Sequence, residues 1–494
     1  MNTVVIGAGV GGLAVAARLA ALGHRVTVCE QAPVVGGKLG TYERVTDAGT
    51  FRFDTGPSLL TMPQVFAELF AATGAPLDES VDLVELDPIV RHRFPDGTVL
   101  DTCRDPAELA DRVAAAFGGH AATQWVRFTE RAARIWDATR GPFLESPLAG
   151  VRTLAREARH VGDLATIAPW RSLRSLAAST LDDPRLRMLV DRYATYTGSD
   201  PRRAPAALAA VPHAELAYGG WYVRGGLATL GDALAERCRQ LGVEVRTATE
   251  VVRITAGPRG VTGVELADGT FLAAEILVAN TDAEHLYTDL LRVPAQARRL
   301  AGTPRSLSGF VLLLGLSGRT EGLAHHTVDF PAAYDAEFDA VFGDPARPVA
   351  DPALYLSVPD DPAVRPDGYE AAFLLVNAAR QGTGPGTVDW RAPGVSAWYA
   401  EHLLDRLAVR GLDVRDRVLF REVISPADLE LRTRAVGGAI YGTSSNGARA
   451  AFLRPANRSP VPGLYLVGGS SHPGGGLPLV ALSARITAGL IGPA

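Results

Sequence analysis

Apolar segments flank a glycine-rich turn at each end of the chain. At the N-terminus, the apolar and β-branched residues Thr3–Ile6 predict a strand, and the alanine-rich segment Leu13–Leu22 predicts a helix that ends at Gly23. Val26–Cys29 predicts the next strand. This order of strand, turn, helix and strand is typical of the first unit of a Rossmann-like parallel sheet.

The C-terminus repeats the order of strand, turn and helix. Residues 464–467 predict a strand, the sequence G-G-S-S-H-P-G-G-G follows at 468–476, and an apolar helix comes next. A single glycine-rich turn suffices for one nucleotide. Two such turns at opposite ends of the chain indicate one large cofactor that both termini hold.

The middle of the chain changes character twice. Residues 65–215 carry helical patterns rich in Ala, Leu and Arg, residues 226–282 return to alternating helix and strand, and residues 305–435 mix the two. The predicted helices are Pro106–Phe117, Gln124–Thr139, Leu227–Leu241 and Val395–Leu407, and the predicted strands are Val243–Arg246, Val251–Thr255, Ile276–Ala279, Gly309–Leu316, Tyr369–Asn377 and the hairpin Val261–Leu266 with Thr270–Ala273.

These elements predict an α/β protein (α+β, two domains) in which a Rossmann-like nucleotide-binding domain is interleaved with a substrate-binding, membrane-facing domain. The expected boundaries are 1–64, 220–300 and 445–494 for the first domain, and 65–219 and 301–444 for the second.

Gly7, Gly9 and Gly12 form a G-x-G-x-x-G sequence between the first strand and the first helix. The first glycine allows the tight turn, the second lets the backbone approach a pyrophosphate, and the third allows helix and sheet to pack closely. Glu30 ends the second strand, where a carboxylate accepts hydrogen bonds from ribose hydroxyls and disfavours a 2′-phosphate.

Two further tight turns follow. Gly37 and Lys38 end a G-G-K sequence in which the chain would pass close to the cofactor and the ammonium would neutralise a phosphate. Gly56 and Pro57 fix an unusual backbone path before Ser58. Lys38 is the only lysine in the sequence, so no other lysine is available as a catalytic base or a Schiff-base amine.

Composition and charge exclude several classes of protein. The net charge of −5 argues against a nucleic-acid partner. The three cysteines are widely spaced without a Cys/His cluster, so we expect neither a disulfide framework nor a metal site. We expect no signal peptide, because the first predicted strand begins at Thr3, and no membrane-spanning helix, because the apolar runs are too short. The expected location is the cytoplasm.

Taken together, the motifs resemble those of the bacterial carotenoid (phytoene) desaturase family, which are FAD-dependent, amine-oxidase-like flavoproteins. The similarity runs essentially end to end, and the H-H-T and S-H-P-G-G-G-L-P elements are its most specific parts. It rests on G-A-G-V-G-G-L (7–13), C-E (29–30), G-G-K (36–38), F-D-T-G-P-S (53–58), G-W-Y-V-R-G-G-L (220–227), L-A-H-H-T-V (323–328) and G-G-S-S-H-P-G-G-G-L-P (468–478).

This resemblance implies FAD as the cofactor and assigns residues to it. Gly7, Gly9 and Gly12 would hold the pyrophosphate, and Glu30 the adenosine ribose. The other implied contacts are Gly37 and Lys38 along the diphosphate, Gly56, Pro57 and Ser58 near the flavin, the backbone of Val251 at the adenine, and Gly469, Gly476, Leu477 and Pro478 at the ribityl chain and pyrimidine edge, with His472 close by.

The implied activity is desaturation of a carotenoid polyene by hydride transfer to the flavin, with oxygen or a quinone as the electron acceptor. The substrate could be phytoene or a 1-hydroxycarotenoid that is desaturated at C3–C4. A different reaction at the polyene end, oxygenation or isomerisation, also stays open. Two other classes also stay open. One is an amine oxidase, disfavoured because many of these use a lysine near the flavin; the other is a non-catalytic isoprenoid-binding escort.

No triad or carboxylate pair identifies a catalytic acid or base. The candidate polar groups are His325 and His326, with a structural role as the alternative, and Asp137 with Arg140 one helical turn away, with an ordinary solvated pair as the alternative.

A carotenoid is insoluble in water, so we expect a peripheral membrane protein. The segment 163–190 combines apolar residues with Trp170 and the arginines at 171 and 174, which suits a membrane-facing surface. A core helix with solvated arginines is the alternative.

Overall fold

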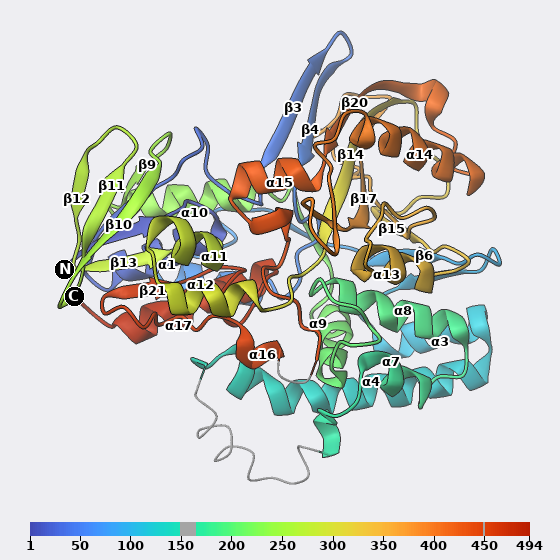
Figure 1. Ribbon diagram of the computed structural model, residues 1–494. Coiled ribbons are helices and arrows are strands. Elements are labelled where there is room, and N and C mark those ends of the chain that lie inside the picture. Colours follow the sequence, from blue (N-terminus) through green and yellow to red (C-terminus); the bar gives the residue numbers. More distant parts are fainter. Residues whose placement is uncertain (149–164, 448–449) are drawn as a thin grey trace.

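The computed structural model describes residues 1–148, 165–447 and 450–494. Its first layer is a parallel five-stranded sheet in the order β21, β13, β1, β2, β9 (Figure 1). The strands come from three distant parts of the chain, and β1 lies at the centre, with Thr3 paired to both Ile276 and Val26. Their bounds are β1 Asn2–Ile6, β2 Arg25–Cys29, β9 Glu244–Arg246, β13 Ile276–Ala279 and β21 Leu464–Leu466.

Alternate side chains of β1 face opposite layers, as a strand's period of two requires. Val5 joins the core formed with α1 (Val10–Ala21), α10 (Thr229–Gln240) and α17 (Leu477–Ile491). Val4 and Ile6 pack against a different group on the other face. That group comprises β10 (Val251–Gly257), β11 (Gly260–Leu266) and β12 (Phe271–Ala273), which form a small antiparallel sheet, together with α11 (Ala283–His285), the π-helical turn Leu286–Leu290 and α12 (Pro294–Ala301).

A seven-stranded sheet forms the second half of the molecule, in the order β20, β14, β17, β16, β15, β6, β7. On β14, Phe310, Leu312 and Leu314 face α14 (Val395–Val409), whereas Val311 and Leu313 face the interior. The bounds are β6 Val90–Arg93, β7 Val99–Thr102, β14 Ser308–Ser317, β15 His326–Asp329, β16 Leu354–Ser357, β17 Tyr369–Ala378 and β20 Val418–Ile424.

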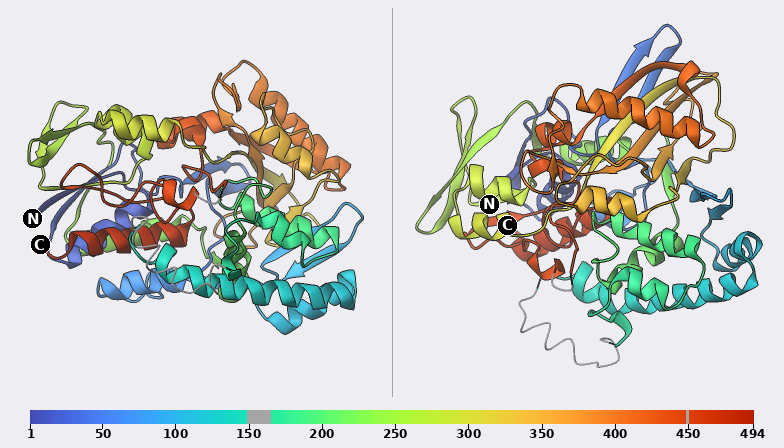
Figure 2. Two further views of the ribbon diagram at one scale, coloured as in Figure 1. Left: turned by 60° about the horizontal axis from the view of Figure 1, so that its bottom comes forward. Right: turned by 45° about the vertical axis from the view of Figure 1, so that its right-hand side comes forward.

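Helices cover the edge of this sheet that carries β6 and β7 (Figure 1, Figure 2). They are α3 (Pro106–Phe117), α4 (Gly119–Thr139), α7 (Leu173–Ala178), α8 (Pro184–Thr195) and α9 (Ala210–Tyr218). The other elements are β3 (Thr41–Thr46), β4 (Gly49–Asp54), α2 (Gln64–Ala72), β5 (Leu83–Glu85), β8 (Trp221–Val223), α13 (Asp335–Phe342), β18 (Arg380–Gln381), β19 (Thr387–Val388), α15 (Pro426–Thr433), α16 (Ala450–Leu453), the π-helical turn Arg140–Leu144 and the 3₁₀ turns Ala206–Ala209, Arg415–Arg417 and Val436–Gly438.

The predicted α/β fold is confirmed, and each predicted helix and strand has a counterpart within a few residues. The prediction for residues 65–215 was incomplete, because β6 and β7 come from this stretch and join the seven-stranded sheet through a parallel pairing of β6 with β15. The chain ends beside its beginning, with the Ala494 backbone N–H donating to the Leu22 carbonyl (Figure 1). Among the described helices, none has the length and apolar character needed to cross a bilayer.

Candidate functional site

A cavity of about 350 Å³ lies between the two large sheets. Both glycine-rich turns line it, together with the interior face of β14 and β17. Of the residues predicted to bind the cofactor, those on its wall are Gly7, Gly9, Glu30, Gly37, Lys38, Gly56, Pro57, Val251, Gly469, Gly476 and Leu477. Gly12, Ser58, His472 and Pro478 do not line it.

The N-terminal turn is built from glycines because no side chain fits there. Gly7 has a φ of +95°, and a Cβ at this position would lie 2.8 Å from the carbonyl oxygen of Asn280. Gly12 does not face the cavity; a Cβ there would lie 2.0 Å from the carbonyl oxygen of Gly7, so this glycine lets α1 approach β1. Gly9, Val10 and Gly11 bring the start of α1 to the cavity wall.

Asn280 joins the two glycine-rich turns, a role that the sequence analysis missed. It follows β13 directly, and its amide donates to the Gly7 carbonyl at 3.3 Å. A Cβ built on Gly468 would lie 2.4 Å from its Oδ1, so the same side chain also touches the C-terminal turn. A polar residue just beyond the carboxyl end of a parallel strand is the signal that could have identified it.

Glu30 is buried where β2 ends. Its Oε2 accepts the backbone N–H of Ala8 at 2.7 Å, and its Oε1 accepts that of Ala32 at 2.9 Å. The carboxylate therefore fixes both the N-terminal turn and the segment after β2. Each oxygen retains a lone pair for a further donor on the cavity side.

Lys38 is half-buried and lies on the cavity wall. Its Nζ donates to the carbonyl oxygens of Ala439 and Ile440 at 3.0 and 2.7 Å. Burial lowers the pKa of the ammonium to about 8, while Asp282 opposes this shift. The ammonium thus ties the G-G-K turn after β2 to the segment before the C-terminal turn.

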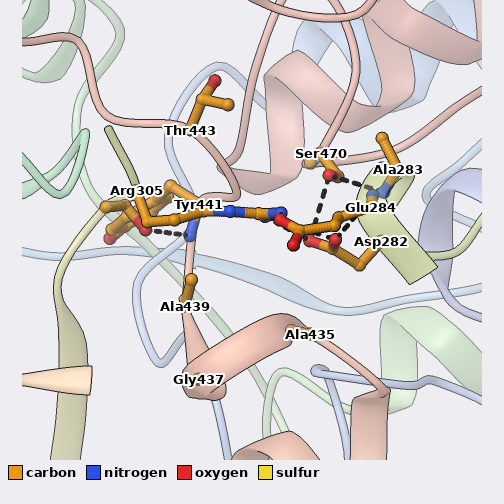
Figure 3. A network of polar contacts seen from close by, with 12 residues as sticks. Asp282, Ala283, Glu284, Arg305, Ala435, Gly437, Ala439, Tyr441, Thr443 and Ser470 are labelled. Atoms are coloured by element: carbon orange, nitrogen blue, oxygen red, sulfur yellow. Dashed lines mark hydrogen bonds and ion pairs between the residues drawn. The ribbon is translucent and has the colours of Figure 1, made fainter. Parts of the chain in front are cut away.

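Asp282, the carboxylate that opposes the pKa shift of Lys38, belongs to a polar network that the sequence did not predict (Figure 3). Arg305 donates to both oxygens of Asp282, at 3.2 and 3.1 Å, and pairs with Glu284. The Ser470 hydroxyl donates to Asp282 at 3.2 Å and accepts the Ala283 N–H at 3.0 Å. Asp282 and Ser470 both line the cavity, so this network fixes the C-terminal turn against the end of β13.

The C-terminal turn places Gly469, Gly476 and Leu477 on the wall and Pro478 in the first turn of α17. Gly476 has a φ of +109°, and a Cβ there would meet no atom within 4 Å. His472 points away from the cavity: its Nε2 donates to the Ser146 carbonyl at 2.9 Å, and burial lowers its pKa.

A buried arginine also supports the C-terminal turn. The Arg454 guanidinium donates to the carbonyls of Tyr441, Gly469 and Thr443 at 2.8 to 2.9 Å. Burial lowers its pKa to about 10.

The opposite wall is apolar and belongs to the seven-stranded sheet. It consists of Gly309 and Val311 on β14 and Phe373 and Leu375 on β17. These residues share one face because they alternate along their strands, and Val311 is paired with Leu375. The cavity therefore has a polar, glycine-rich side and an apolar side.

The turn after β4 connects the cavity to residues behind its wall. Gly56 and Pro57 line the cavity, and the Ser58 hydroxyl is hydrogen-bonded to the Tyr355 hydroxyl at 2.7 Å. Tyr355 is in turn hydrogen-bonded to His326 Nδ1 at 2.9 Å.

His325 and His326 lie together, with ring centroids 4.5 Å apart, but neither lines the cavity. Burial lowers the pKa of His325 to about 4 and keeps that of His326 well below its usual value. Both rings are therefore neutral at pH 7.

Asp137 and Arg140 are not brought to the cavity. Asp137 is exposed, and Arg140 forms an ion pair with Glu145 at 2.6 Å and donates to the Tyr218 hydroxyl.

Comparison with known proteins agrees with this geometry. Residues 10–332 match the family model of flavin-containing amine oxidoreductases. The chain is 34% identical over 490 residues to a 4,4′-diapolycopene oxygenase from Methylomonas sp, with 98% of this chain and 97% of the relative covered. It is 35% identical over 499 residues to a hydroxyneurosporene desaturase from Cereibacter sphaeroides, with 98% and 96% covered.

Solved structures share the fold. An oxidoreductase from Methanosarcina mazei superposes with a TM-score of 0.62 at 17% identity, covering 98% of this chain and 99% of the other. Putrescine oxidase with bound putrescine gives a TM-score of 0.63 at 17% identity, covering 99% of both chains. At this level of identity the likeness concerns the fold alone.

Proposed function

The chain belongs to the family of flavin-containing amine oxidoreductases, and from this premise we propose that it is an FAD-dependent oxidoreductase that desaturates a carotenoid polyene. The names of the two curated relatives describe enzymes acting on carotenoids, and both matches span nearly the whole chain. The observation that carries the proposal is the two-sided cavity, with glycine-rich turns on one side and an apolar sheet on the other.

The polar side fits a dinucleotide. The first backbone N–H groups of α1 have no acceptor within the helix and lie at the cavity, where they and the helix dipole favour a pyrophosphate. Glu30 and Val251 both line the cavity, where Glu30 would accept ribose hydroxyls and the backbone of Val251 would contact the adenine. The open space beside Gly476 and the start of α17 suit the flavin's pyrimidine edge.

When bound, FAD would accept the hydride that leaves the polyene. The chain's own residues then have to orient the substrate and exclude water. Val311, Phe373 and Leu375 supply an apolar surface for a hydrocarbon chain, and the neutral His325 and His326 lie behind the wall. The same apolar surface favours a polyene over a cationic amine.

The first test is to express the protein in a bacterium that accumulates phytoene and to record the absorption spectrum of the extract. A shift from the ultraviolet into the visible would support phytoene desaturation. No shift with phytoene, but conversion of a 1-hydroxycarotenoid, would place the reaction later in the sequence of modifications. Peroxide release with amines and no polyene conversion would overturn the proposal in favour of an amine oxidase. A protein purified without flavin would favour an escort.

The apolar wall can be tested in the same system. Leu375→Asn introduces an amide into the cavity wall, and we expect KM for the polyene to rise about 10-fold because apolar contact is lost. Val423→Asn is the matched control, since Val423 is half-buried on the opposite face of the same sheet. Equal effects of both substitutions would argue against this wall as the polyene site.

We also propose that the protein binds membrane surfaces peripherally. Residues 163 and 164 of the predicted face lie outside the described residues. Within 165–190, Leu173 and Leu176 are buried, but Trp170 is 71% exposed. Trp170→Ala should weaken co-sedimentation with lipid vesicles, whereas Trp398→Ala, which alters an exposed tryptophan on α14, should not. Protein that stays in solution with every vesicle composition would contradict membrane binding.

Two further features remain part of this proposal. The five-stranded sheet and its covering layers would form the FAD-binding domain (1–64, 220–300 and 445–494). The seven-stranded sheet with α3, α4, α7, α8 and α9 would form the substrate-binding domain (65–219 and 301–444). Oxygen or a quinone would reoxidise the flavin, which stopped-flow reoxidation with each acceptor can distinguish.

A further inference from the structure

A cluster of buried polar side chains lies behind the wall that Phe373 and Tyr441 contribute to the cavity. We call it the buried polar cluster; it comprises Arg192, Tyr193 and Tyr196 at the end of α8, Glu215 on α9 and Tyr355 on β16. No role in holding the cofactor has been assigned to these residues.

Arg192 is the central member. Arg192 is 7% exposed. Its Cζ lies 5.8 Å from the centre of the Tyr196 ring and 5.7 Å from the centre of the Tyr355 ring. Its Nε is enclosed and has no hydrogen-bond partner, and in the described part of the chain no carboxylate forms an ion pair with it. Buried guanidinium groups are normally paired, so the enclosed Nε of Arg192 lacks the partner that such a group usually has.

Glu215 leaves an acceptor unused in the same cluster. Its Oε1 accepts the Tyr193 hydroxyl at 2.7 Å, but its Oε2 is enclosed without a partner. Burial raises the pKa of this carboxyl to about 7. A buried donor and a buried acceptor, both unsatisfied, are costly for folding alone and therefore point to a polar ligand.

The cluster borders the cavity at two places. Tyr355 is hydrogen-bonded to Ser58, which directly follows Gly56 and Pro57 on the cavity wall. Tyr441 lines the cavity and packs against Gly198, just after α8; a Cβ on Gly198 would lie 2.9 Å from its ring. The cluster therefore lies directly beside the cavity, separated from it by Tyr441 and by the turn that carries Ser58.

We propose that the buried polar cluster binds an oxygen function, a hydroxyl or carbonyl, at one end of an otherwise apolar substrate, with Arg192 as the donor. This inference rests on the proposed function and narrows its substrate class to oxygenated polyenes. A pure hydrocarbon would bury the guanidinium without offering it an acceptor, whereas an oxygen at the chain end would satisfy it.

The test uses purified, FAD-loaded protein and polyenes of equal length in phosphatidylcholine vesicles: a hydrocarbon, its 1-hydroxy derivative and its terminal aldehyde. Binding is followed by quenching of tryptophan fluorescence, and kcat and KM are measured separately. We expect at least one oxygenated polyene to bind about 10-fold more tightly than the hydrocarbon, the size of effect typical of a hydrogen bond to a charged group.

Three variants sharpen the test. Arg192→Met should remove the preference by raising KM for the oxygenated polyene, and Arg192→Lys should retain part of it, which keeps the test valid if the Met variant does not fold. Arg406→Met is the matched control, because Arg406 also has an enclosed, unpaired Nε but lies on α14, beyond the opposite face of the sheet.

The outcomes separate this inference from the proposed function. Equal binding of hydrocarbon and oxygenated polyenes by the wild type, or a preference that survives in both Arg192 variants, would overturn the inference and leave polyene desaturation standing; the cluster would then hold water only. Failure to bind or convert any polyene would overturn both.

Discussion

At the scale of single residues, the N-terminal turn requires a residue without a Cβ at position 12. Gly12→Ala would place a Cβ 2.0 Å from the Gly7 carbonyl oxygen, so α1 has to move away from β1. We expect a loss of about 3 kcal/mol in the free energy of unfolding, measured by urea denaturation, and weaker retention of FAD. Gly489→Ala is the control; its Cβ would meet nothing within 4 Å, so a gain of up to about 1 kcal/mol is expected. Equal stability of both variants would contradict the close packing of α1 on β1.

Another single residue, Glu215, makes stability depend on pH. Burial raises the pKa of its carboxyl from 4.5 to about 7 in the folded protein, so folding takes up a proton between these values. The stabilisation is complete below pH 4.5 and is lost as the pH rises through 7, with a total change of about 3 kcal/mol. Urea denaturation at pH 5 and pH 8 should show a larger loss for the wild type than for Glu215→Gln. Parallel losses would mean that this carboxyl is not the source.

At the scale of elements, β4 and α10 are joined by a capping interaction between distant segments. Asp54, the last residue of β4, accepts the backbone N–H groups of Leu227 and Ala228 at 2.8 and 2.9 Å, just before α10 begins. Asp54→Asn removes one acceptor, and we expect a loss of about 1–2 kcal/mol in urea denaturation. Asp268→Asn alters an exposed hairpin aspartate and should change stability by less than about 0.5 kcal/mol, because Asn-Gly turns serve as well as Asp-Gly. Similar effects of both would argue against the cap.

The same scale shows what the sequence could predict. Helix α3 was predicted to the residue because its apolar positions recur with the helical period. Strand β14 was predicted nearly to the residue because it is a continuous apolar run, buried on both faces. Strand β6 was missed because its four residues V-R-H-R carry no such signal, and its parallel pairing with β15 is a long-range contact.

Polar contacts between distant segments were similarly out of reach. Of the fifteen residues that the motifs predict to bind the cofactor, eleven line the cavity. The positions of Arg305 and Arg192 depend on which distant segments the fold brings together, and their local sequence contains no information about that. Lys38 shows the same limit: its sequence context predicts a phosphate contact but gives no sign that its ammonium also donates to the carbonyls of Ala439 and Ile440.

At the scale of the whole molecule, the cavity is where the two large sheets meet. Its wall takes Gly9 and Glu30 from the five-stranded sheet's side, Gly309 and Phe373 from the seven-stranded sheet, and Gly476 from the C-terminal turn. A ligand that fills this space contacts the N-terminus, the middle and the C-terminus of the chain at once. FAD should therefore stabilise both sheets together, by about 2.7 kcal/mol at a free concentration 100 times its dissociation constant.

Hydrogen exchange can test this coupling, because local opening reports stability segment by segment. We expect FAD to slow amide exchange in β1 and in residues 468–476, and also in β14 and β17, which carry the apolar wall. The C-terminal half of α14, which covers the far face of the seven-stranded sheet, serves as an internal reference: protection there would show that the whole sheet is stabilised, not only the wall. Protection confined to β1, β2 and the two glycine-rich turns would mean that the two sheets open independently. The substrate wall would then be free to move while the cofactor stays bound.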